Sequence, residues 1–411
     1  MANFLFVVDK FFPDVSAGTI CCNNILEVMQ SLGHNVDILT IKRNYQDEDV
    51  CVFDGSMVFR LNTYHHEWTK KLKKSKWEDI NVVLRKLIGL TNKIKAKFNP
   101  LALNGYLDTV NVNKLYKTIK QNIDAPYDAM LTFTEPFAIM PICKKLMQKG
   151  IAKKWCTFML DDFIYNNFHK DIPFAKREKI ANSVFKLNSK IFIVDGVLVE
   201  ATKEGYVAEY KDKLIDIHQP MLTAKNQGNE PFGDGVNLVY AGLFYADIRR
   251  PNEMLDVLKD LPVGYNIHLY GNGCEDIVQE KSKLFTNSKL LIHGRVPYGE
   301  SIQAISNANI LVNLSNKDTY QIPSKILEYV GFGKPIINFY FSEDDICLNI
   351  FKNYPVCYNL NVTNYTQADV DGLIEFCKKH TNTLLSYKEA TKNLQEYTIE
   401  YITNKVLKEL I

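Results

Sequence analysis

Residues 320–337 read YQIPSKILEYVGFGKPII and predict a short helix with an abrupt start. Pro323 suits the first helical position, because the first N–H groups of a helix have no partner within it and proline lacks this group. The N–H groups of Ser324 and Lys325 then face outward, and the Lys325 ammonium adds a full charge to the partial positive charge of the helix end. A phosphate fits such a place.

The same helix carries Glu328 one turn after Lys325 and ends sharply. The carboxylate oxygens of Glu328 are acceptors that suit sugar hydroxyls. Gly333 followed by Pro335 predicts the helix end, and residues 336–341 read as a strand. Taken alone, the stretch is equally well explained as a surface helix with an ordinary Lys–Glu pair.

The length and the charge balance limit the classes of protein. A chain of 411 residues is too long for one ordinary core and predicts two domains. Its 49 Lys and Arg against 47 Asp and Glu give a net charge of +2, which disfavours a nucleic acid as the partner.

The cysteines and the apolar stretches indicate where the protein acts. Nine cysteines show no metal-ligand spacing, and the apolar residues 3–8 read as a first strand rather than a signal peptide. No apolar stretch approaches the roughly 20 residues needed to span a bilayer. We therefore expect reduced thiols, no metal, and a cytoplasmic protein whose membrane association, if any, is peripheral at the inner face of the cell membrane.

The first half of the chain alternates strands and helices. Residues 4–8, 19–31 and 36–41 read as strand, helix and strand, which is a βαβ unit. Further apolar strands are expected at residues 129–133, 156–160, 191–194 and 214–217. This alternation predicts a mostly parallel, doubly wound sheet, and we assign residues 1–222 to a first domain.

The second half repeats the alternation after a polar segment. Residues 223–236 are rich in glycine and polar residues, and we expect a linker there. Residues 237–383 form the expected second domain, with strands at 238–241, 267–270, 290–293, 310–314 and 336–341. Residues 384–411 read as helices that pack back toward the first domain.

Ligands of open parallel sheets bind beyond the carboxyl ends of the strands, so the loops that follow strands are the places to search. Arg249 and Arg250 precede Pro251 at a helix start and could grip a diphosphate with two guanidinium groups. The alternative is a pair of solvated arginines.

Two more loops of the second half follow strands. Gly271-Asn272-Gly273 lets the backbone come close to a ligand, although any tight turn between a strand and a helix uses glycine. The loop with Arg295 and Val296 could read the edge of a base through its backbone groups, or it could be an ordinary loop.

Together these motifs resemble a known family. Tyr-Ala-Gly with Arg-Arg-Pro, then Tyr-Gly-Asn-Gly, His-Gly-Arg-Val, and Gln-Ile-Pro-Ser-Lys-Ile-Leu-Glu-Tyr with Gly-Lys-Pro follow one another as in the C-terminal domain of GT-B glycosyltransferases. The likeness is greatest to family 4-like enzymes that build bacterial surface polysaccharides. FFPDVSAG and SLGHNVDILT are similar to the acceptor domain of these enzymes, so the resemblance covers nearly the whole chain. It implies two doubly wound, Rossmann-like α/β domains that face each other across a cleft.

The resemblance also implies roles for individual residues. Arg249 or Arg250 with Lys325 would clamp a diphosphate, and Glu328 would bind the ribose. The implied donor-binding residues are Gly18, Arg250, Gly271, Gly273, Arg295, Val296, Tyr320, Gln321, Ser324 and Glu328. One position departs from the family, because Tyr320, with Gln321 beside it, stands where a carboxylate usually contacts the donor sugar.

In the first domain, loops after strands supply candidates for the acceptor side. Gly18 would let its loop approach the donor phosphates. Glu135 and Asp162 follow predicted strands and could orient an acceptor hydroxyl, Asp162 as a catalytic group beside Arg249 and Lys325. Ordinary polar loop residues are the plainer interpretation of both, and a structural role is the safer one for His218.

A basic segment at residues 70–97 could bind an anionic membrane surface. Lysines, among them Lys73 and Lys74, alternate there with an apolar stripe, and two tryptophans, Trp68 and Trp77, lie at or beside its start. The stripe includes Ile80, Leu84, Leu87 and Ile94. The alternative is a solvated helix whose stripe packs on the domain.

The resemblance thus implies a metal-independent hexosyltransferase that needs no cofactor. Its donor would be a nucleotide diphosphate sugar, with a UDP-sugar expected, and its acceptor a glycan or lipid-linked glycan, with retention of stereochemistry. The alternatives are a nucleotide-sugar epimerase of the same architecture and a non-catalytic nucleotide-sugar-binding subunit.

Overall fold

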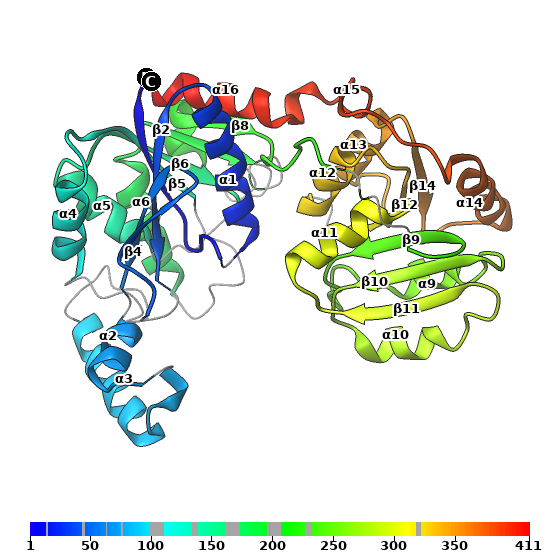
Figure 1. Cartoon of the computed structure of the whole chain (residues 1–411), viewed down its shortest axis with the longest axis horizontal. Coiled ribbons are helices and arrows are strands. Elements are labelled where there is room, and N and C mark those ends of the chain that lie inside the picture. The colour runs from blue at the N-terminus through cyan, green and yellow to red at the C-terminus, as the bar shows by residue number, and fades with distance from the viewer. Residues whose placement is uncertain are drawn as a thin grey trace. The chain divides into compact units, whose positions relative to one another are not determined.

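A computed structural model gives the fold as two compact units. It describes residues 1–13, 15–42, 46–62, 64–74, 77–97, 111–133, 139–161, 164, 173–194, 197, 207–226, 228, 232–317 and 322–411. One unit comprises Met1–Gln219 together with Ile402–Ile411, and the other comprises Pro220–Tyr401 (Figure 1).

The first unit is built on an eight-stranded sheet of order β3-β4-β2-β1-β5-β6-β7-β8. All neighbouring strands run parallel except β3, which pairs antiparallel with β4 at one edge. The strands are β1 (Asn3–Val7), β2 (Asn35–Ile41), β3 (Val50–Phe53), β4 (Ser56–Leu61), β5 (Tyr127–Phe133), β6 (Ala152–Met159), β7 (Lys190–Val194) and β8 (Leu214–Ile217).

The central strand of this sheet shows why the sequence folds in this way. In β1, Phe4, Leu5, Phe6 and Val7 are all fully buried, and Phe6 lies in register with Ile38 of β2. A strand that is apolar on both faces needs cover on both faces, which helices provide in a parallel sheet. The helices are α1 (Ala17–Ser31), α2 (Tyr64–Lys71), α3 (Val82–Lys97), α4 (Asn111–Gln121), α5 (Met140–Gln148), α6 (Phe174–Phe185), α8 (Val207–Tyr210) and α16 (Ile399–Leu410).

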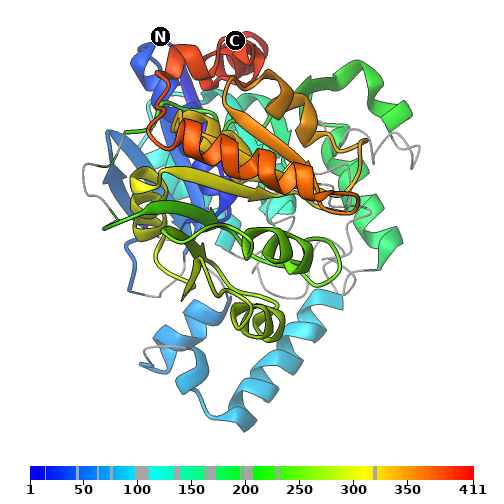
Figure 2. The same ribbon diagram turned by 90° about the vertical axis from the view of Figure 1, so that its right-hand side faces the viewer.

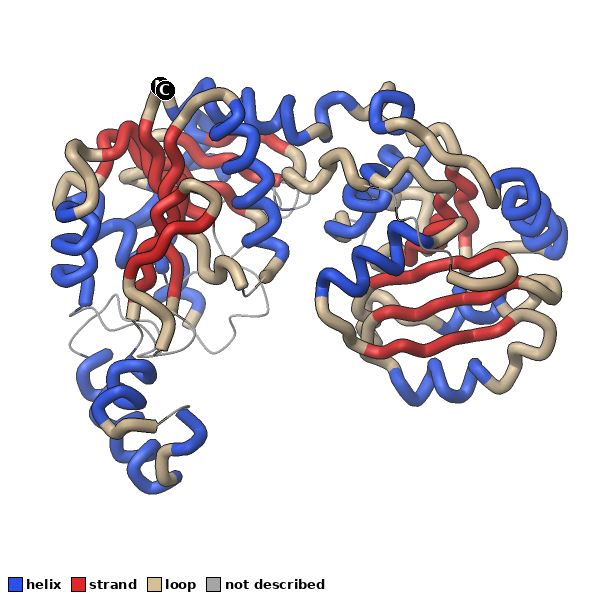
Figure 3. Tube along the Cα trace, in the orientation of Figure 1, coloured by secondary structure: helices blue, strands red, loops and turns tan. Residues whose placement is uncertain are grey.

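The second unit has a six-stranded, wholly parallel sheet of order β11-β10-β9-β12-β13-β14, and Figure 3 colours its strands red along the tube. The strands are β9 (Val236–Ala241), β10 (Tyr265–Tyr270), β11 (Lys289–Gly294), β12 (Ile310–Leu314), β13 (Ile336–Tyr340) and β14 (Cys357–Asn361). The chain winds outward from β9 to β11 and then returns to β12, on the other side of β9. The carboxyl ends of β9 and β12 therefore form the switch point at which such sheets bind ligands.

Helices cover this second sheet (Figure 2). They are α9 (Asn252–Leu258), α10 (Glu275–Ser282), α11 (Tyr298–Asn307), α12 (Ser324–Gly331), α13 (Cys347–Asn353), α14 (Gln367–His380) and α15 (Tyr387–Ala390). One core cluster joins Leu238 of β9 to Leu255 of α9 and Leu373 of α14. The expectation of two doubly wound α/β sheets is confirmed.

Several local features differ from the expectation. Pro323 is the residue before α12, with φ −61° and ψ 128°, so the helix begins at Ser324 rather than at the proline. The hairpin of β3 and β4 and the edge strand β14 were not predicted.

In the described ranges the cysteines are free thiols, and there is neither a metal-ligand cluster nor a helix that could cross a membrane. All nine cysteines are free thiols, and burial raises the pKa of Cys21 and Cys22 well above the usual range. Within these ranges no three metal-ligating side chains gather to hold an ion. Nor does any helix of the described part combine the length and the apolar character that crossing a membrane requires.

Candidate functional site

A buried tyrosine fixes the position of the helix α12 at the switch point. Tyr329 is 1% exposed, and its hydroxyl accepts a hydrogen bond of 2.8 Å from the N–H of Ala241, the last residue of β9. Burial raises the pKa of the Tyr329 hydroxyl well above its usual range, so the group stays protonated. The helix that begins at Ser324 is thereby tied to the carboxyl end of the central strand.

Three side chains meet on this helix and on α11. Glu328 is 1% exposed; its Oε1 accepts a hydrogen bond of 2.6 Å from the hydroxyl of Tyr298, and its Oε2 forms an ion pair with Nζ of Lys325. The Lys325 ammonium also lies 5.1 Å from the centre of the Tyr298 ring. Burial and the neighbouring Glu328 charge raise the pKa of Tyr298 well above its usual range. The Lys325 charge is therefore partly balanced and held in place by Glu328.

Tyr298 was not among the predicted site residues. It follows Pro297 in the loop after β11 and opens α11, and that position was the signal available in the sequence. The position alone did not show that its hydroxyl reaches Glu328, thirty residues later in the chain.

The loop after β9 is tied to the loop after β12 through Arg249. Its Nε donates to Oδ1 of Asn316 at 2.9 Å, and its backbone pairs with Tyr245 in both directions. The N–H of Lys317 donates to the carbonyl of Ile248 at 2.6 Å. Arg249 is half-buried in this arrangement. It therefore lies at the carboxyl end of β12, which α12 follows.

The neighbouring Arg250 is exposed at the start of α9 and differs from Arg249 in its surroundings. Of the two arginines, Arg249 is thus the one whose guanidinium is held in a defined position.

The glycines after β10 are required by the adjacent loop. Gly271 has φ 146°, and a Cβ there would lie 1.8 Å from the carbonyl oxygen of Gly242. Gly273 has φ 98°, and its Cβ would lie 2.2 Å from the carbonyl oxygen of Phe244. Backbone hydrogen bonds hold the two loops together, with Gly242 donating to Tyr270 and Phe244 to Asn272. The close approach that these glycines allow is therefore to the loop after β9.

A small cavity opens at the carboxyl ends of β10 and β11. Its volume is about 90 Å³, and one polar wall is formed by Glu275, which accepts a hydrogen bond of 2.8 Å from the N–H of Gly273. The next loop brings exposed Arg295 and half-buried Val296 after Gly294. The lining residues are Phe244, Leu269, Gly271, Asn272, Gly273, Glu275, Val278, Gln279, Ile292 and Gly294.

Two histidines that the sequence analysis did not single out lie side by side on β10 and β11, and we call this pair the His268–His293 ladder. His268 of β10 and His293 of β11 approach at 3.0 Å through their ring nitrogens, and His268 also contacts Oδ1 of Asn237 at 3.1 Å. Burial, together with the smaller effect of the nearby His293, lowers the pKa of His268 to about 4. Both rings are therefore neutral near pH 7.

In the first unit, Gly18 lies in the first turn of α1, after the Ser16 capping box. A Cβ at Gly18 would lie 3.6 Å from the nearest atom, Oγ of Ser16, so the packing would accept an alanine. Asp161 is half-buried directly after β6, and His218 is half-buried after β8.

Several predicted residues lie outside the described part of the chain. These are Glu135, Asp162, Tyr320 and Gln321, together with the side chains of Ser324 and Trp77.

The predicted apolar stripe of the basic segment does not lie on one face. Ile80 is 2% exposed and Leu84 is half-buried, whereas Leu87 and Ile94 are 56% and 50% exposed. The interpretation of these four as a single stripe is wrong, because Ile80 precedes α3 and packs inward. Lys73 and Lys74 are exposed, and Trp68 is half-buried under the Lys71 ammonium.

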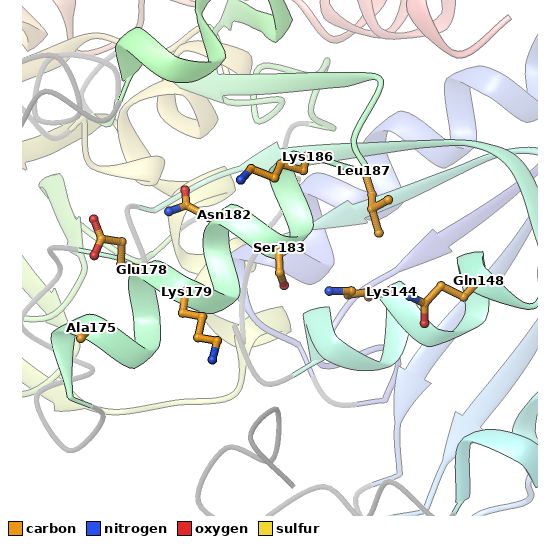
Figure 4. Close-up of a pocket in the computed structure, with 9 residues that line it drawn as sticks. All are labelled: Lys144, Gln148, Ala175, Glu178, Lys179, Asn182, Ser183, Lys186 and Leu187. Carbon is orange, nitrogen blue, oxygen red and sulfur yellow. The ribbon is translucent and has the colours of Figure 1, made fainter.

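A larger hollow, of about 690 Å³, lies between α5 and α6 on the outer helices of the first unit (Figure 4). Lys144, Lys179 and Lys186 contribute positive charge to it, and Glu178 contributes negative charge. Lys186 precedes β7 by a few residues, so the hollow extends toward the amino ends of the strands. It is thus not part of the carboxyl edge where parallel sheets bind ligands.

Solved structures of known proteins are similar to this chain in fold. No family model matches this chain, and no curated protein matches its sequence. Among solved structures, HepE from Anabaena, bound to UDP and glucose, is similar over 100% of this chain and 99% of its own, with 12% identity and a TM-score of 0.60. TarM from S. aureus matches 100% of this chain and 99% of its own at 10% identity and a TM-score of 0.62.

A third similar structure is WaaG, described as a glycosyltransferase involved in lipopolysaccharide biosynthesis. It matches over 99% of each chain with 10% identity and a TM-score of 0.54. These proteins are GT-B glycosyltransferases, and this chain shares their fold.

Proposed function

We propose that this protein is a GT-B glycosyltransferase that moves a hexosyl group from a UDP-sugar to a glycan or lipid-linked glycan. The observation that carries the proposal is the cluster of Lys325, Glu328 and Tyr298 at the first turns of α12, fixed at the switch point of the second sheet. Solved GT-B structures with UDP-glucose and with UDP and α-GlcNAc-glycerol support the donor and acceptor classes.

The leaving diphosphate would be stabilised by positive groups at the start of α12. The N–H groups of the first turn, the Lys325 ammonium and the Arg249 guanidinium gather at the ends of β9 and β12. Fixed charges and dipoles of this kind stabilise charge that develops in the transition state, as a metal ion does elsewhere. We therefore propose a metal-independent reaction in which Arg249 and Lys325 act on the diphosphate.

The nucleoside would lie toward β10 and β11. The cavity there is lined by apolar side chains such as Phe244 and Leu269 and by polar ones such as Asn272 and Gln279, which suit the flat face and polar edge of a base. Val296 and Arg295 follow directly, Tyr298 opens α11 after this loop, and its hydroxyl donates to Glu328 of α12. We propose that the ribose is bound by this pair.

The first unit would bind the acceptor. Gly18 lies in the first turn of α1, which follows β1 at the carboxyl edge of the first sheet. Glu135 and Asp162 lie outside the described residues and are candidates from the sequence alone. We propose Asp162 as the group that orients the acceptor hydroxyl, with retention of stereochemistry as in family 4-like enzymes. Synthesis of surface polysaccharide on the inner face of the cell membrane is the corresponding setting.

An acceptor-dependence assay tests this function. Purified protein is incubated with UDP-sugars, with and without a pooled lipid-linked and free glycan acceptor, and UDP release and sugar products are measured. Sugar incorporated into the acceptor supports the transferase. Conversion of the donor sugar to an epimer without any acceptor would show an epimerase, and tight binding without either product would show a binding subunit.

A further inference from the structure

One face of the helix α3 carries apolar side chains that are exposed in the described part of the chain. Val83, Leu87, Leu90 and Ile94 are 67%, 56%, 56% and 50% exposed. Their spacing of i, i+4, i+7 and i+11 places them in one line along the helix. We call these four side chains the outer stripe.

The outer stripe is separate from the face by which α3 attaches to its own unit. Ile88 is 3% exposed and Leu84 is half-buried, and both lie on another side of the helix. The unit has therefore already buried one apolar face of α3. A second exposed face of this length is not needed for folding and indicates a contact with something else.

The charges around the outer stripe identify what that contact is. Lys86 is exposed beside it, and the sequence of α3 contains no acidic residue. Lys70, Lys71, Lys73 and Lys74, at the end of α2 and just after it, are exposed as well. Apolar side chains flanked by lysines match a bilayer surface with anionic headgroups, where the apolar face enters the acyl boundary and the ammonium groups meet phosphates.

The position of α2 and α3 in the first unit supports the same partner. The helix α2 follows the carboxyl end of β4, and β4 runs parallel to β2, which runs parallel to β1. The loop with Gly18 follows the carboxyl end of β1 at the same edge of the sheet. Figures 1 and 2 both show α2 and α3 extending beyond the sheet at this edge. A bilayer bound there would lie on the side where the proposed acceptor loops end.

We infer that the outer stripe of α3 docks the protein on an anionic phospholipid surface, together with the exposed Lys70, Lys71, Lys73, Lys74 and Lys86. The inference rests on the proposed function in one respect only: docking would serve to bring a lipid-linked acceptor to the first unit. The docking itself is a physical property of the full chain and can be measured without any sugar.

Vesicle co-sedimentation of the full chain tests the docking. Vesicles of phosphatidylcholine alone and of phosphatidylcholine with phosphatidylglycerol are compared at low and high salt. We expect binding to the anionic vesicles, weaker at high salt, and a loss of about tenfold or more for the double variant Leu87→Gln with Ile94→Gln. Both residues are exposed, so the variant should fold, which circular dichroism and its melting temperature verify.

Matched controls separate this surface from general stickiness. Val263→Gln with Leu284→Gln removes two exposed apolar side chains from the second unit, which are 80% and 48% exposed, and should leave vesicle binding unchanged. Lys73→Glu with Lys74→Glu should abolish the preference for anionic vesicles. Equal binding of wild type and the Leu87→Gln, Ile94→Gln variant would overturn the inference. Absence of binding by wild type would overturn it too, as would a stripe-dependent dimer in solution.

The failure of docking and the failure of the proposed function give different results. Calorimetric binding of UDP and turnover with a lipid-free acceptor do not involve the outer stripe. If both are retained while vesicles are not bound, the docking inference alone fails. If vesicles are bound through the stripe but UDP is not bound, the proposed function fails and the docking stands.

Discussion

The hydroxyl of Tyr298 donates a 2.6 Å hydrogen bond to Oε1 of Glu328, a carboxylate that is only 1% exposed. Because Lys325 pairs with the other oxygen, Glu328 is held from both sides. A ribose that approaches this carboxylate must share it with Tyr298 or displace the tyrosine. We therefore propose that Tyr298 controls access to Glu328, the group that the family resemblance assigns to the ribose.

Removing the Tyr298 hydroxyl should weaken both the fold and nucleotide binding. Tyr298→Phe leaves a buried carboxylate oxygen without its donor, which costs about 1–3 kcal/mol in the free energy of unfolding. Nucleotide affinity should fall about tenfold, because Glu328 and Lys325 are then less firmly placed. Urea unfolding and calorimetric titration with UDP measure the two effects.

Tyr401→Phe is the control for this variant, because Tyr401 is 48% exposed in α16. Equal stability and equal affinity of Tyr298→Phe and wild type would contradict the role given to Tyr298.

The three glycines should respond differently to alanine. Gly271→Ala and Gly273→Ala force a Cβ into a backbone carbonyl at a positive φ, so each should lower the free energy of unfolding by about 2 kcal/mol or more. Gly18→Ala meets only ordinary contacts in a helix and should leave stability unchanged or raise it by up to about 1 kcal/mol. Thermal and urea unfolding of the three variants test this.

Gly18→Ala should nevertheless reduce turnover if its loop approaches the donor phosphates. A Gly18→Ala enzyme with wild-type stability and wild-type kcat/KM would remove Gly18 from the proposed site.

The His268–His293 ladder predicts a stability that falls in mild acid. The pKa of His268 is lowered to about 4 in the fold, against an ordinary value of 6.5 in the unfolded chain. Between these values the unfolded chain binds a proton that the folded protein does not, so the free energy of unfolding decreases as the pH falls from 6.5 toward 4. The loss attributable to His268 is about 3 kcal/mol when the pH reaches 4.

Urea unfolding at pH 7 and pH 5 checks the ladder. His268→Gln, which keeps a polar group near Asn237, should flatten the dependence on pH. A dependence as steep as that of wild type would assign the effect to other groups.

Replacing each of the two arginines after β9 by alanine should have different effects on stability and on kcat/KM. Arg249→Ala breaks the hydrogen bond to Asn316 and removes the guanidinium nearest α12, so we expect a loss of about 1 kcal/mol in stability and a drop in kcat/KM of about a hundredfold. Arg250→Ala removes an exposed side chain and should change stability little. Steady-state kinetics with a UDP-sugar, beside urea unfolding, compare the pair; a larger kinetic loss for Arg250→Ala would reverse the assignment.

The parallel sheets could be predicted from sequence because their strands are apolar on both faces. Stretches such as residues 4–8 and 310–314 are continuously apolar, so they must be buried on both faces, as in a parallel sheet covered by helices. Glycines mark the turns between such stretches. The hairpin of β3 and β4 was not predicted, because Val50–Phe53 is half-exposed at the edge of the sheet and lacks this continuous apolar pattern. The edge strand β14 escaped for the same reason, since most of it is only half-buried.

The candidate site was predictable only where it depends on local sequence. A helix start with Lys325 and Glu328 three residues apart is a local feature, and the structure brings the two into an ion pair. The bond from Tyr298 to Glu328 and the packing of Gly271 on Gly242 join distant segments. Contacts of this kind depend on which strands are neighbours, which a single sequence does not specify.

The outer stripe of α3 is a second feature that a single sequence does not specify. Helical spacing revealed that α3 is amphipathic, but not which of its two apolar faces the domain covers. Only the exposures of Ile88 and Leu87, 3% and 56%, distinguish the inner face from the outer one.

The central claim is that a nucleotide sugar binds at the start of α12, and calorimetric titration tests it most directly. The wild-type protein is titrated with UDP and a panel of UDP-sugars, beside Glu328→Gln and Lys325→Gln, which keep the size and polarity of each side chain. Exposed Glu375→Gln and Lys352→Gln serve as controls. The account predicts binding of UDP and at least one UDP-sugar, weakened about tenfold or more by the two α12 variants and unchanged by the controls. No binding of any nucleotide by the wild type, or binding that Glu328→Gln and Lys325→Gln leave intact, would contradict it.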